Sequence, residues 1–276
     1  MTNKTCRTRK VVLILVEGPS DRKALKLLKK YINKSNPGFS DYYTIYFEET
    51  KGDVTTRKEY IDIPNESRFE KVKTEISYHV QTFIKDRKFL LEDIAIVFHL
   101  LDMDGAYIPD EWICPMTEAE KSSNKPVLYY DKSVHARLFR KAAFNPPCEL
   151  HKGKRFAMDH LLLTYRIKVV SDSENKTIPY RLFFMSCNLE HFFYGERNFP
   201  DNEKEKQAEN LEKTYSVEEY MSFLKKYEMI EMQEYGVSWY YIRRRNENSL
   251  SRCSNVLLIS DFCREMAVKL SEGEKK

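Results

Sequence analysis

Residues 11–21 read VVLILVEGPSD, and this stretch predicts the centre of the fold. Its first six residues are apolar, which is typical of a strand buried on both faces of a parallel sheet. The run ends in Glu17, a glycine and a proline, and leucines then recur at helical spacing to about Asn33. Glu17 is therefore expected at the carboxyl end of a central strand, where open α/β sheets bind ligands. Asp21, one helical turn later, is expected to face the same place.

A second stretch, residues 94–105, reads IAIVFHLLDMDG and repeats this pattern. It predicts another buried strand that ends in Asp102 and Asp104. Residues two apart on an extended chain point the same way, so both carboxylates are expected to aim at one point. If the two strands are neighbours, Glu17 and this pair form a site for a hard cation. Oxygen ligands without His or Cys favour Mg²⁺ or Mn²⁺.

The rest of the chain predicts an α/β fold in which a mostly parallel sheet has helices on both faces. Further strands are expected at 42–47 and 180–185, and a helix at 67–86 with a Ser67–Glu70 capping box. The core is expected over residues 1–200, with an insertion at about 105–178 that is broken by prolines and holds a short helix at 135–144. Residues 201–276 are expected to form a mostly helical extension, with strands near 237–242 and 255 and a final helix to about 270.

Composition limits the classes of protein that fit. The chain has 276 residues, of which 42% are hydrophobic, so it can bury a core. A net charge of +4 identifies no particular partner, so any nucleic-acid surface must be local. Six cysteines without a CxxC pair, and no apolar run long enough to span a bilayer, predict a cytoplasmic protein with no membrane partner.

Basic residues gather near aromatic ones in the predicted insertion. Such clusters can contact phosphates, although a solvated loop face explains them equally well. The candidate nucleic-acid-binding residues are Arg137, Arg140, Lys141, Lys152, Lys154 and Arg155.

Strand-Glu-Gly-x-Ser-Asp, one further strand-helix unit, and strand-Asp-x-Asp-Gly together resemble the Toprim domain of topoisomerases, bacterial primases and several nucleases. A third motif, Asn188-Leu189-Glu190 after a strand, is similar to the overcoming-lysogenisation-defect type of phage-defence nuclease. The resemblance covers residues 9–195 with a long interruption. It implies a Mg²⁺- or Mn²⁺-dependent nuclease that cuts DNA or RNA in phage or mobile-element defence.

The same resemblance implies roles for individual residues. Glu17, Asp102 and Asp104 would be catalytic, and these three with Asp21 and Glu190 would hold metal. No Gly-x-x-x-x-Gly-Lys motif is present, so an ATPase sensor working with this nuclease would be a separate chain.

Other interpretations of these residues remain open. Acids suit the first turn of a helix, and Asp residues are common in turns before a glycine. His99 or His191 could act as a base, but a lone His beside an apolar strand is more often packed. Residues 101–105 also resemble the first motif of haloacid-dehalogenase phosphatases, in which Asp102 would be the nucleophile and a later Lys is required. A non-catalytic binding module is the last alternative, although clustered acids repel phosphate unless a metal neutralises them.

Overall fold

A computed structural model describes residues 9–36, 38–60, 63–121, 127–130, 132–135, 149–170, 175–227 and 229–273. Within them, five strands form one sheet in the order β2-β1-β3-β7-β6. The strands are β1 (Lys10–Val16), β2 (Tyr43–Glu49), β3 (Ile94–Asp102), β6 (Arg166–Val170) and β7 (Asn175–Met185). β1 is parallel to β2 and β3, and β3 is parallel to β7; β6 is antiparallel to β7 at the edge. The predicted mostly parallel α/β sheet is confirmed.

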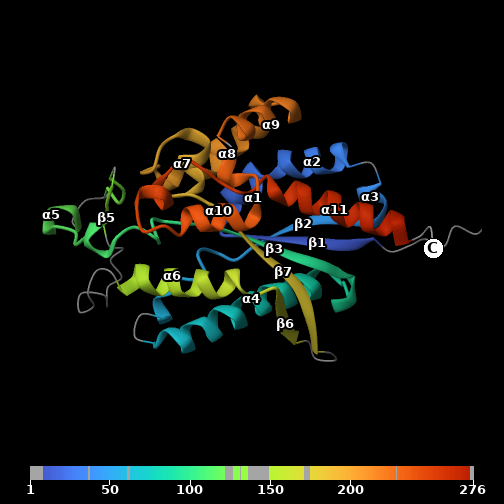
Figure 1. Ribbon diagram of the computed structural model, residues 1–276, viewed down its shortest axis with the longest axis horizontal. Helices are drawn as coiled ribbons and strands as arrows, with labels where there is room; N and C mark the ends of the chain where they lie inside the picture. The colour runs from blue at the N-terminus through green and yellow to red at the C-terminus, as the bar shows by residue number, and fades with distance from the viewer. Residues whose placement is uncertain are drawn as a thin grey trace, which may run out of the picture.

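Helices cover both faces of this sheet (Figure 1). The described helices are α1 (Pro19–Ala24), α2 (Lys26–Ser35), α3 (Phe39–Tyr42), α4 (Asn65–Arg87), α5 (Glu118–Lys121), α6 (Glu149–Leu162), α7 (Leu189–Tyr194), α8 (Asp201–Thr214), α9 (Val217–Lys226), α10 (Tyr235–Ile242) and α11 (Leu258–Gly273). A short ribbon of β4 (Ile113–Cys114) and β5 (Val134–His135) lies outside the main sheet.

The sheet separates two apolar cores because successive side chains of a strand point to opposite faces. Val11, Leu13 and Leu15 of β1 face a core that includes residues of α4, α6 and α10. The alternate β1 residues face a core built with α2, α3, α7, α8, α9 and α11. Every β1 residue after Lys10 is buried, as the apolar run predicts.

The regions expected to be an insertion and an extension contribute to these cores. α6, within residues 105–178, packs Ala157, Met158 and Leu161 against the α4 side of the sheet. α8 and α9 lie over α1 and α2 in Figure 1, where the Tyr220 hydroxyl donates to the Ala24 carbonyl oxygen at 2.9 Å. Much of the second core therefore comes from residues after 200.

Three expected details of secondary structure are wrong. Residues 235–242 form helix α10 instead of a strand, because Ser238, Trp239 and Ile242 lie on one helical side and bury against the β7 face. α4 begins at Asn65, so Ser67 lies inside the helix and does not cap it. In place of a strand near 255, Ser254 forms one isolated bridge with Met185. The helix expected at 135–144 lies outside the described residues from 136 onward.

Gly153 on α6 allows the Arg68 side chain of α4 to cross the helix. A Cβ at position 153 would lie 1.0 Å from Arg68 Nη1. Arg68 is buried, and its Nη2 donates to the Tyr60 carbonyl oxygen at 2.8 Å. We therefore expect Gly153→Ala to lower the free energy of unfolding by about 1–3 kcal/mol, as overpacking does.

Urea denaturation measures this change. The control is Gly236→Ala in α10, where the added Cβ would meet nothing closer than Glu234 Oε1 at 4.0 Å. The control should be neutral or stabilise by up to about 1 kcal/mol, as expected for Gly→Ala in a helix. Equal effects of the two substitutions would contradict this account of Gly153.

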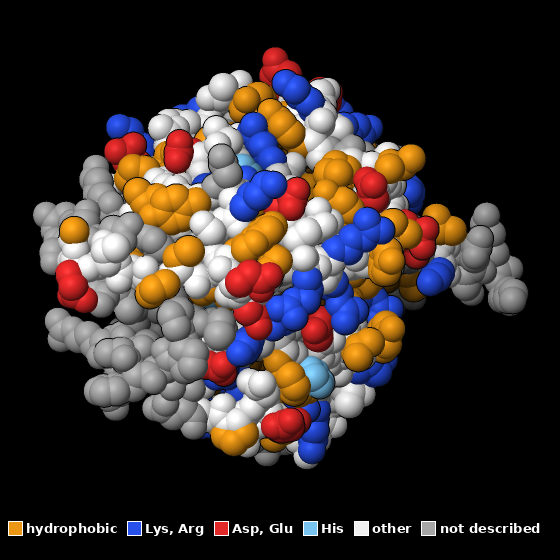
Figure 2. Space-filling view, turned by 60° about the vertical axis from the view of Figure 1, so that its left-hand side comes forward, with side chains coloured by type: hydrophobic (Ala, Val, Ile, Leu, Met, Phe, Trp, Pro, Cys, Tyr) orange, Lys and Arg blue, Asp and Glu red, His pale blue; other side chains and the backbone are white. Residues whose placement is uncertain are grey.

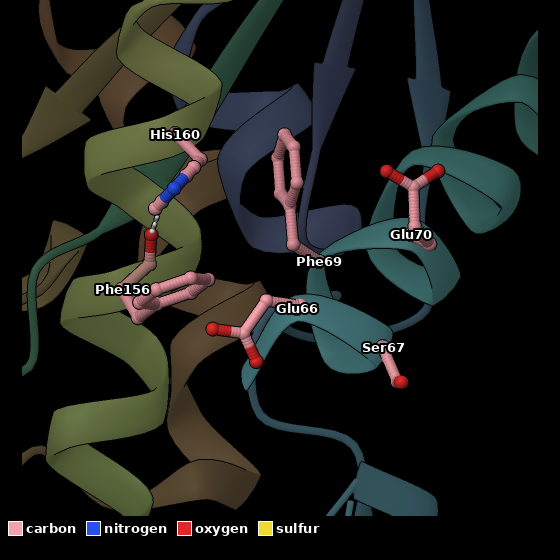
Figure 3. Close-up of a pocket in the computed structure, with 6 residues that line it drawn as sticks. All are labelled: Glu66, Ser67, Phe69, Glu70, Phe156 and His160. Carbon is pink, nitrogen blue, oxygen red and sulfur yellow. Dashed lines mark hydrogen bonds between the residues drawn. The ribbon is translucent and has the colours of Figure 1, made fainter. Parts of the chain in front are cut away.

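A solvent-open pocket of about 320 Å³ lies between α4 and α6. Figure 3 shows Phe156 and His160 of α6 facing Phe69 and Glu66 of α4 across it. The Phe156 and His160 rings stack with centroids 4.0 Å apart. The cavity lining includes no member of the motifs that end the central strands.

In the described part of the chain, no helix is both long enough and apolar enough to cross a membrane.

Candidate functional site

The edge of the sheet formed by the carboxyl ends of β1, β2, β3 and β7 carries a group of acidic side chains. Glu17 directly follows β1, and its Oε1 accepts a hydrogen bond from the Asp102 backbone N–H at the end of β3 (3.1 Å). This bond is possible because β1 and β3 are adjacent parallel strands, so their ends meet. The Glu17 and Asp102 motifs, 85 residues apart in sequence, therefore lie together.

Asp21 lies in the first turn of α1. Its Oδ2 accepts a hydrogen bond from the Gly18 backbone N–H at 2.7 Å, so it caps the start of the helix. Burial raises the pKa of Asp21 to about 7, and the negative charge of Glu190 adds to this effect. Asp21 therefore combines the ordinary role of a helix-start acid with a position near the other carboxylates.

Asp104 also belongs to the acidic group, but its backbone conformation differs from the extended one that was expected. The strand ends at Asp102, and Asp104 has a φ of 49°, so residues 102–104 are not extended. The Asp104 N–H donates to the Cys187 carbonyl oxygen at 2.7 Å, which joins this turn to the end of β7. Its carboxylate accepts from the Tyr129 hydroxyl through Oδ1 and from Lys154 Nζ through Oδ2, the latter at 2.8 Å.

Glu190, on the first turn of α7 after β7, is only 4% exposed. Its Oε2 lies 3.7 Å from the ammonium of Lys204 on α8. Burial raises the pKa of Glu190, and the Lys204 charge counteracts part of that rise. The Asn188–Glu190 motif is therefore placed at the same sheet edge as the first two motifs.

Asp53 and Lys154 complete the group, and the sequence motifs did not identify either in this role. Asp53 follows β2, and its Oδ1 accepts from the backbone and hydroxyl of Thr55 at 2.7 and 2.6 Å. Lys154 Nζ lies 2.8 Å from both Asp53 Oδ2 and Asp104 Oδ2. Burial raises the pKa of Asp53, but the Lys154 ammonium outweighs it and lowers the value overall.

Two sequence signals could have found this pair. Asp53 lies in a loop that follows a parallel strand, at the edge where Glu17 was expected. Lys154 falls on the apolar stripe of α6, four residues before Met158 and seven before Leu161, so this spacing could have indicated a buried position instead of the predicted phosphate-binding one. Lys154 is 1% exposed and does not lie on a basic surface.

The acidic side chains perturb one another strongly. Burial raises the pKa of Glu17 to about 8, with the charge of Asp53 as the next cause. Burial also raises the pKa of Asp102 well above its usual range, and the charges of Glu17 and Asp21 raise it further. Carboxyl groups that resist ionisation in this way gain stability from a nearby cation.

His99 and His191, the two histidines considered as bases, have lowered pKa values. His99 is fully buried, with Nδ1 2.8 Å from the Tyr180 hydroxyl, and burial lowers its pKa to about 3. Burial lowers the pKa of His191 to about 4. Both imidazoles are therefore packed and only weakly basic, so neither fits the role of catalytic base that the sequence left open.

A metal ion requires several donor atoms around one point. Among the described residues, no three His, Cys, Asp or Glu side chains already surround one point where a metal ion would fit. The chemistry of the donors does fit Mg²⁺ or Mn²⁺, because the buried groups are carboxylate oxygens that repel one another. Coordination would require side-chain rotation, in particular release of Glu17 from the Asp102 N–H.

The predicted phosphate-binding residues separate into three groups. Arg137, Arg140 and Lys141 lie outside the described residues, and Lys154 is buried in the acidic group. The Lys152 side chain is 37% exposed and that of Arg155 only 19%, and they lie 4.0 and 3.2 Å from Asp110 respectively. Arg245 joins them at 2.7 Å from Asp110 Oδ1, and Arg243 lies 2.8 Å from Asp159 of α6. On the face drawn in Figure 2, Lys and Arg side chains gather with Asp and Glu side chains between them.

No protein-family model, curated protein or solved structure matches this chain. The class of protein that the fold defines is an α/β protein with a mostly parallel sheet and an acidic group at one sheet edge.

A pH effect on stability follows from the acidic group. Between pH 6.5 and 8 the folded protein keeps a proton on Glu17 that the unfolded chain has released, since the folded pKa is about 8 and the ordinary value is 4.5. Stability gained from a raised pKa is lost as the pH rises through that value. In EDTA we expect the free energy of unfolding to fall by roughly 2 kcal/mol across this window.

Urea denaturation at several pH values measures the slope. His99 and His191 oppose this slope near pH 6.5, because their folded pKa values of about 3 and 4 keep them neutral while the unfolded imidazoles still lose protons as the pH rises. Glu17→Gln should make the slope smaller, and the raised pKa values of Asp21 and Asp102 account for part of what remains. Constant stability of the wild type from pH 6.5 to 8 would contradict the raised pKa.

Proposed function

We propose that this protein is a divalent-metal-dependent nuclease that hydrolyses phosphodiester bonds. The observation that carries the proposal is the convergence of Glu17, Asp102, Asp53 and Glu190 from the ends of four sheet strands into one mutually repelling group. Active sites of open α/β sheets lie at this edge. A group of acids can approach a phosphate only when a cation neutralises them.

Each member has a role in this proposal. Glu17, Asp102, Asp21 and Glu190 would hold Mg²⁺ or Mn²⁺, which when bound would neutralise the scissile phosphate and make a water molecule more acidic. Glu17 would accept the proton of the attacking water once a bound cation has lowered its raised pKa and left the carboxylate ionised. Asp104, predicted as both catalytic and a metal ligand, engages Tyr129 and Lys154 and would orient the turn after β3.

The surface basic residues support a nucleic-acid substrate. Lys152 and Arg155 share α6 with Lys154, so a phosphate backbone that lies along the outer side of α6 would pass close to the acidic group. Arg243 and Arg245 extend this basic cluster from the segment after α10. Tyr240 is 67% exposed and Arg244 stacks on it at 5.0 Å, which is the kind of platform on which an unpaired base stacks.

A haloacid-dehalogenase-like phosphatase is the second enzyme considered. It would need a lysine against Asp102, the candidate nucleophile. The buried lysine contacts Asp104 and Asp53 instead, so this arrangement supports the nuclease better. A non-catalytic module gains nothing from acids that repel phosphate, so it also ranks lower.

Cleavage of supercoiled plasmid and of total tRNA, with Mg²⁺, Mn²⁺ or EDTA, tests the proposal. We expect one substrate class to be cut by the wild type with metal, and no cutting with EDTA or by Glu17→Ala. Cleavage of p-nitrophenyl phosphate without cleavage of either nucleic acid would favour the phosphatase. Binding of nucleic acid without cutting, both for the protein alone and with its captured ATPase partner added, would favour the non-catalytic binding module.

The resemblance to phage-defence proteins adds a biological role to this proposal. We propose that the nuclease acts against phage or mobile elements, together with a separate ATPase sensor chain. Capture of an ATPase on the tagged protein from infected cells tests the partner. Protection against phage that Glu17→Ala abolishes tests the role.

A further inference from the structure

The acidic group divides into two parts with different charge balance. Asp53 and Asp104 share one buried ammonium, that of Lys154, which lies 2.8 Å from an oxygen of each. The Lys154 side chain is 2% exposed, and those of Asp53 and Asp104 are 3% and 7% exposed. The other part consists of Glu17, Asp21, Asp102 and Glu190. Lys204 at its rim lies 3.7 Å from Glu190 and 2.9 Å from Asp201, and its charge also acts on Asp21.

The oxygens of the first part are already engaged. Asp53 Oδ1 accepts from Thr55, and its Oδ2 accepts from Thr56 at 2.8 Å as well as from Lys154. Asp104 Oδ1 accepts from Tyr129, and its Oδ2 from Lys154. A divalent ion between these two carboxylates would have to displace a buried ammonium and break these bonds.

The second part has the opposite character. Glu17 Oε1 accepts only a backbone N–H at 3.1 Å, and Asp21 Oδ2 accepts the Gly18 N–H at 2.7 Å. Asp102 ends β3 beside Glu17, with its backbone N–H 3.1 Å from Glu17 Oε1, and the acidic charges that act on it outnumber the one from Lys204. This part of the site gains most from an added cation.

We propose that Lys154 permanently occupies the cation position between Asp53 and Asp104, so that the protein binds a single divalent ion, at Glu17, Asp102, Asp21 and Glu190. Lys154 takes the place that a second metal ion holds in two-metal phosphodiesterases. Asp104 is then a partner of Lys154 and not a metal ligand. This inference deepens the proposed nuclease function and rests on it.

Titration of the full chain with Mn²⁺ tests this count, with isothermal calorimetry and the electron paramagnetic resonance signal of free Mn²⁺ as readouts. We expect one ion per chain for the wild type and for Lys154→Arg, which keeps the charge. Lys154→Gln removes the ammonium and should bind a second ion. Mn²⁺ should also raise the Tm of Lys154→Gln more than that of the wild type.

A pair of aspartate variants provides the matched comparison, and it does not depend on whether Lys154→Gln folds. Asp102→Asn should lose the ion, whereas Asp104→Asn should keep one ion with affinity reduced by about 10–100-fold, as for a residue outside the coordination sphere. Two ions in the wild type, or equal loss of binding in the two aspartate variants, would overturn this inference alone. No Mn²⁺ binding by the wild type would overturn the proposed metal-dependent function itself.

Discussion

Glu17→Gln is expected to slow metal-dependent cleavage by about 10²–10⁴-fold, the range that a general base contributes. Glutamine keeps the shape and can still accept the Asp102 N–H hydrogen bond, but it cannot take a proton from water. The loss should therefore appear in the rate of the chemical step. Single-turnover cleavage at saturating metal measures this rate.

Two controls separate the roles of Glu17. Glu203→Gln changes an exposed acid of α8 and should leave the rate unchanged. A Mn²⁺ titration of Glu17→Gln shows whether the ion is still bound. Binding that disappears together with activity would make Glu17 chiefly a ligand, and a rate within about threefold of the wild type would contradict any role in catalysis.

Lys154→Met is expected to lower the free energy of unfolding by about 3–5 kcal/mol in EDTA, the cost of breaking a buried ion pair from one side. Methionine fills the space of the aliphatic stem but leaves Asp53 and Asp104 buried without their shared ammonium. Urea denaturation at pH 7 measures the change. This effect is large because both carboxylates depend on one charge.

Lys152→Met is the matched control, since it changes the same residue type two positions away on α6. The Lys152 side chain is 37% exposed and pairs with Glu149 at 3.0 Å. Its loss should change stability by less than about 0.5 kcal/mol, as for most surface positions. A similar small change in both variants would show that the Lys154 pairs contribute little to folding.

Sequence patterns predicted the strands and helices whose apolar residues follow a clear local pattern. Six apolar residues before Glu17, and seven apolar residues with His99 before Asp102, predicted two buried strands, and both are present as β1 and β3. Patterns failed where packing determined the structure: the aromatic run at 235–242 suits a strand, but burial of Trp239 and Ile242 beside β7 makes it helix α10.

The carboxylate site illustrates the same division. The sequence by itself determined that Glu17, Asp102 and Glu190 follow strands, and parallel strands bring their carboxyl ends to one edge, so their proximity follows from topology. Only the tertiary structure decided that Lys154 joins them and pairs with Asp53, because α6 reaches this edge through packing between residues about 100 apart in sequence. Such long-range contacts leave no periodic signal in the sequence, since they depend on how complete elements pack together.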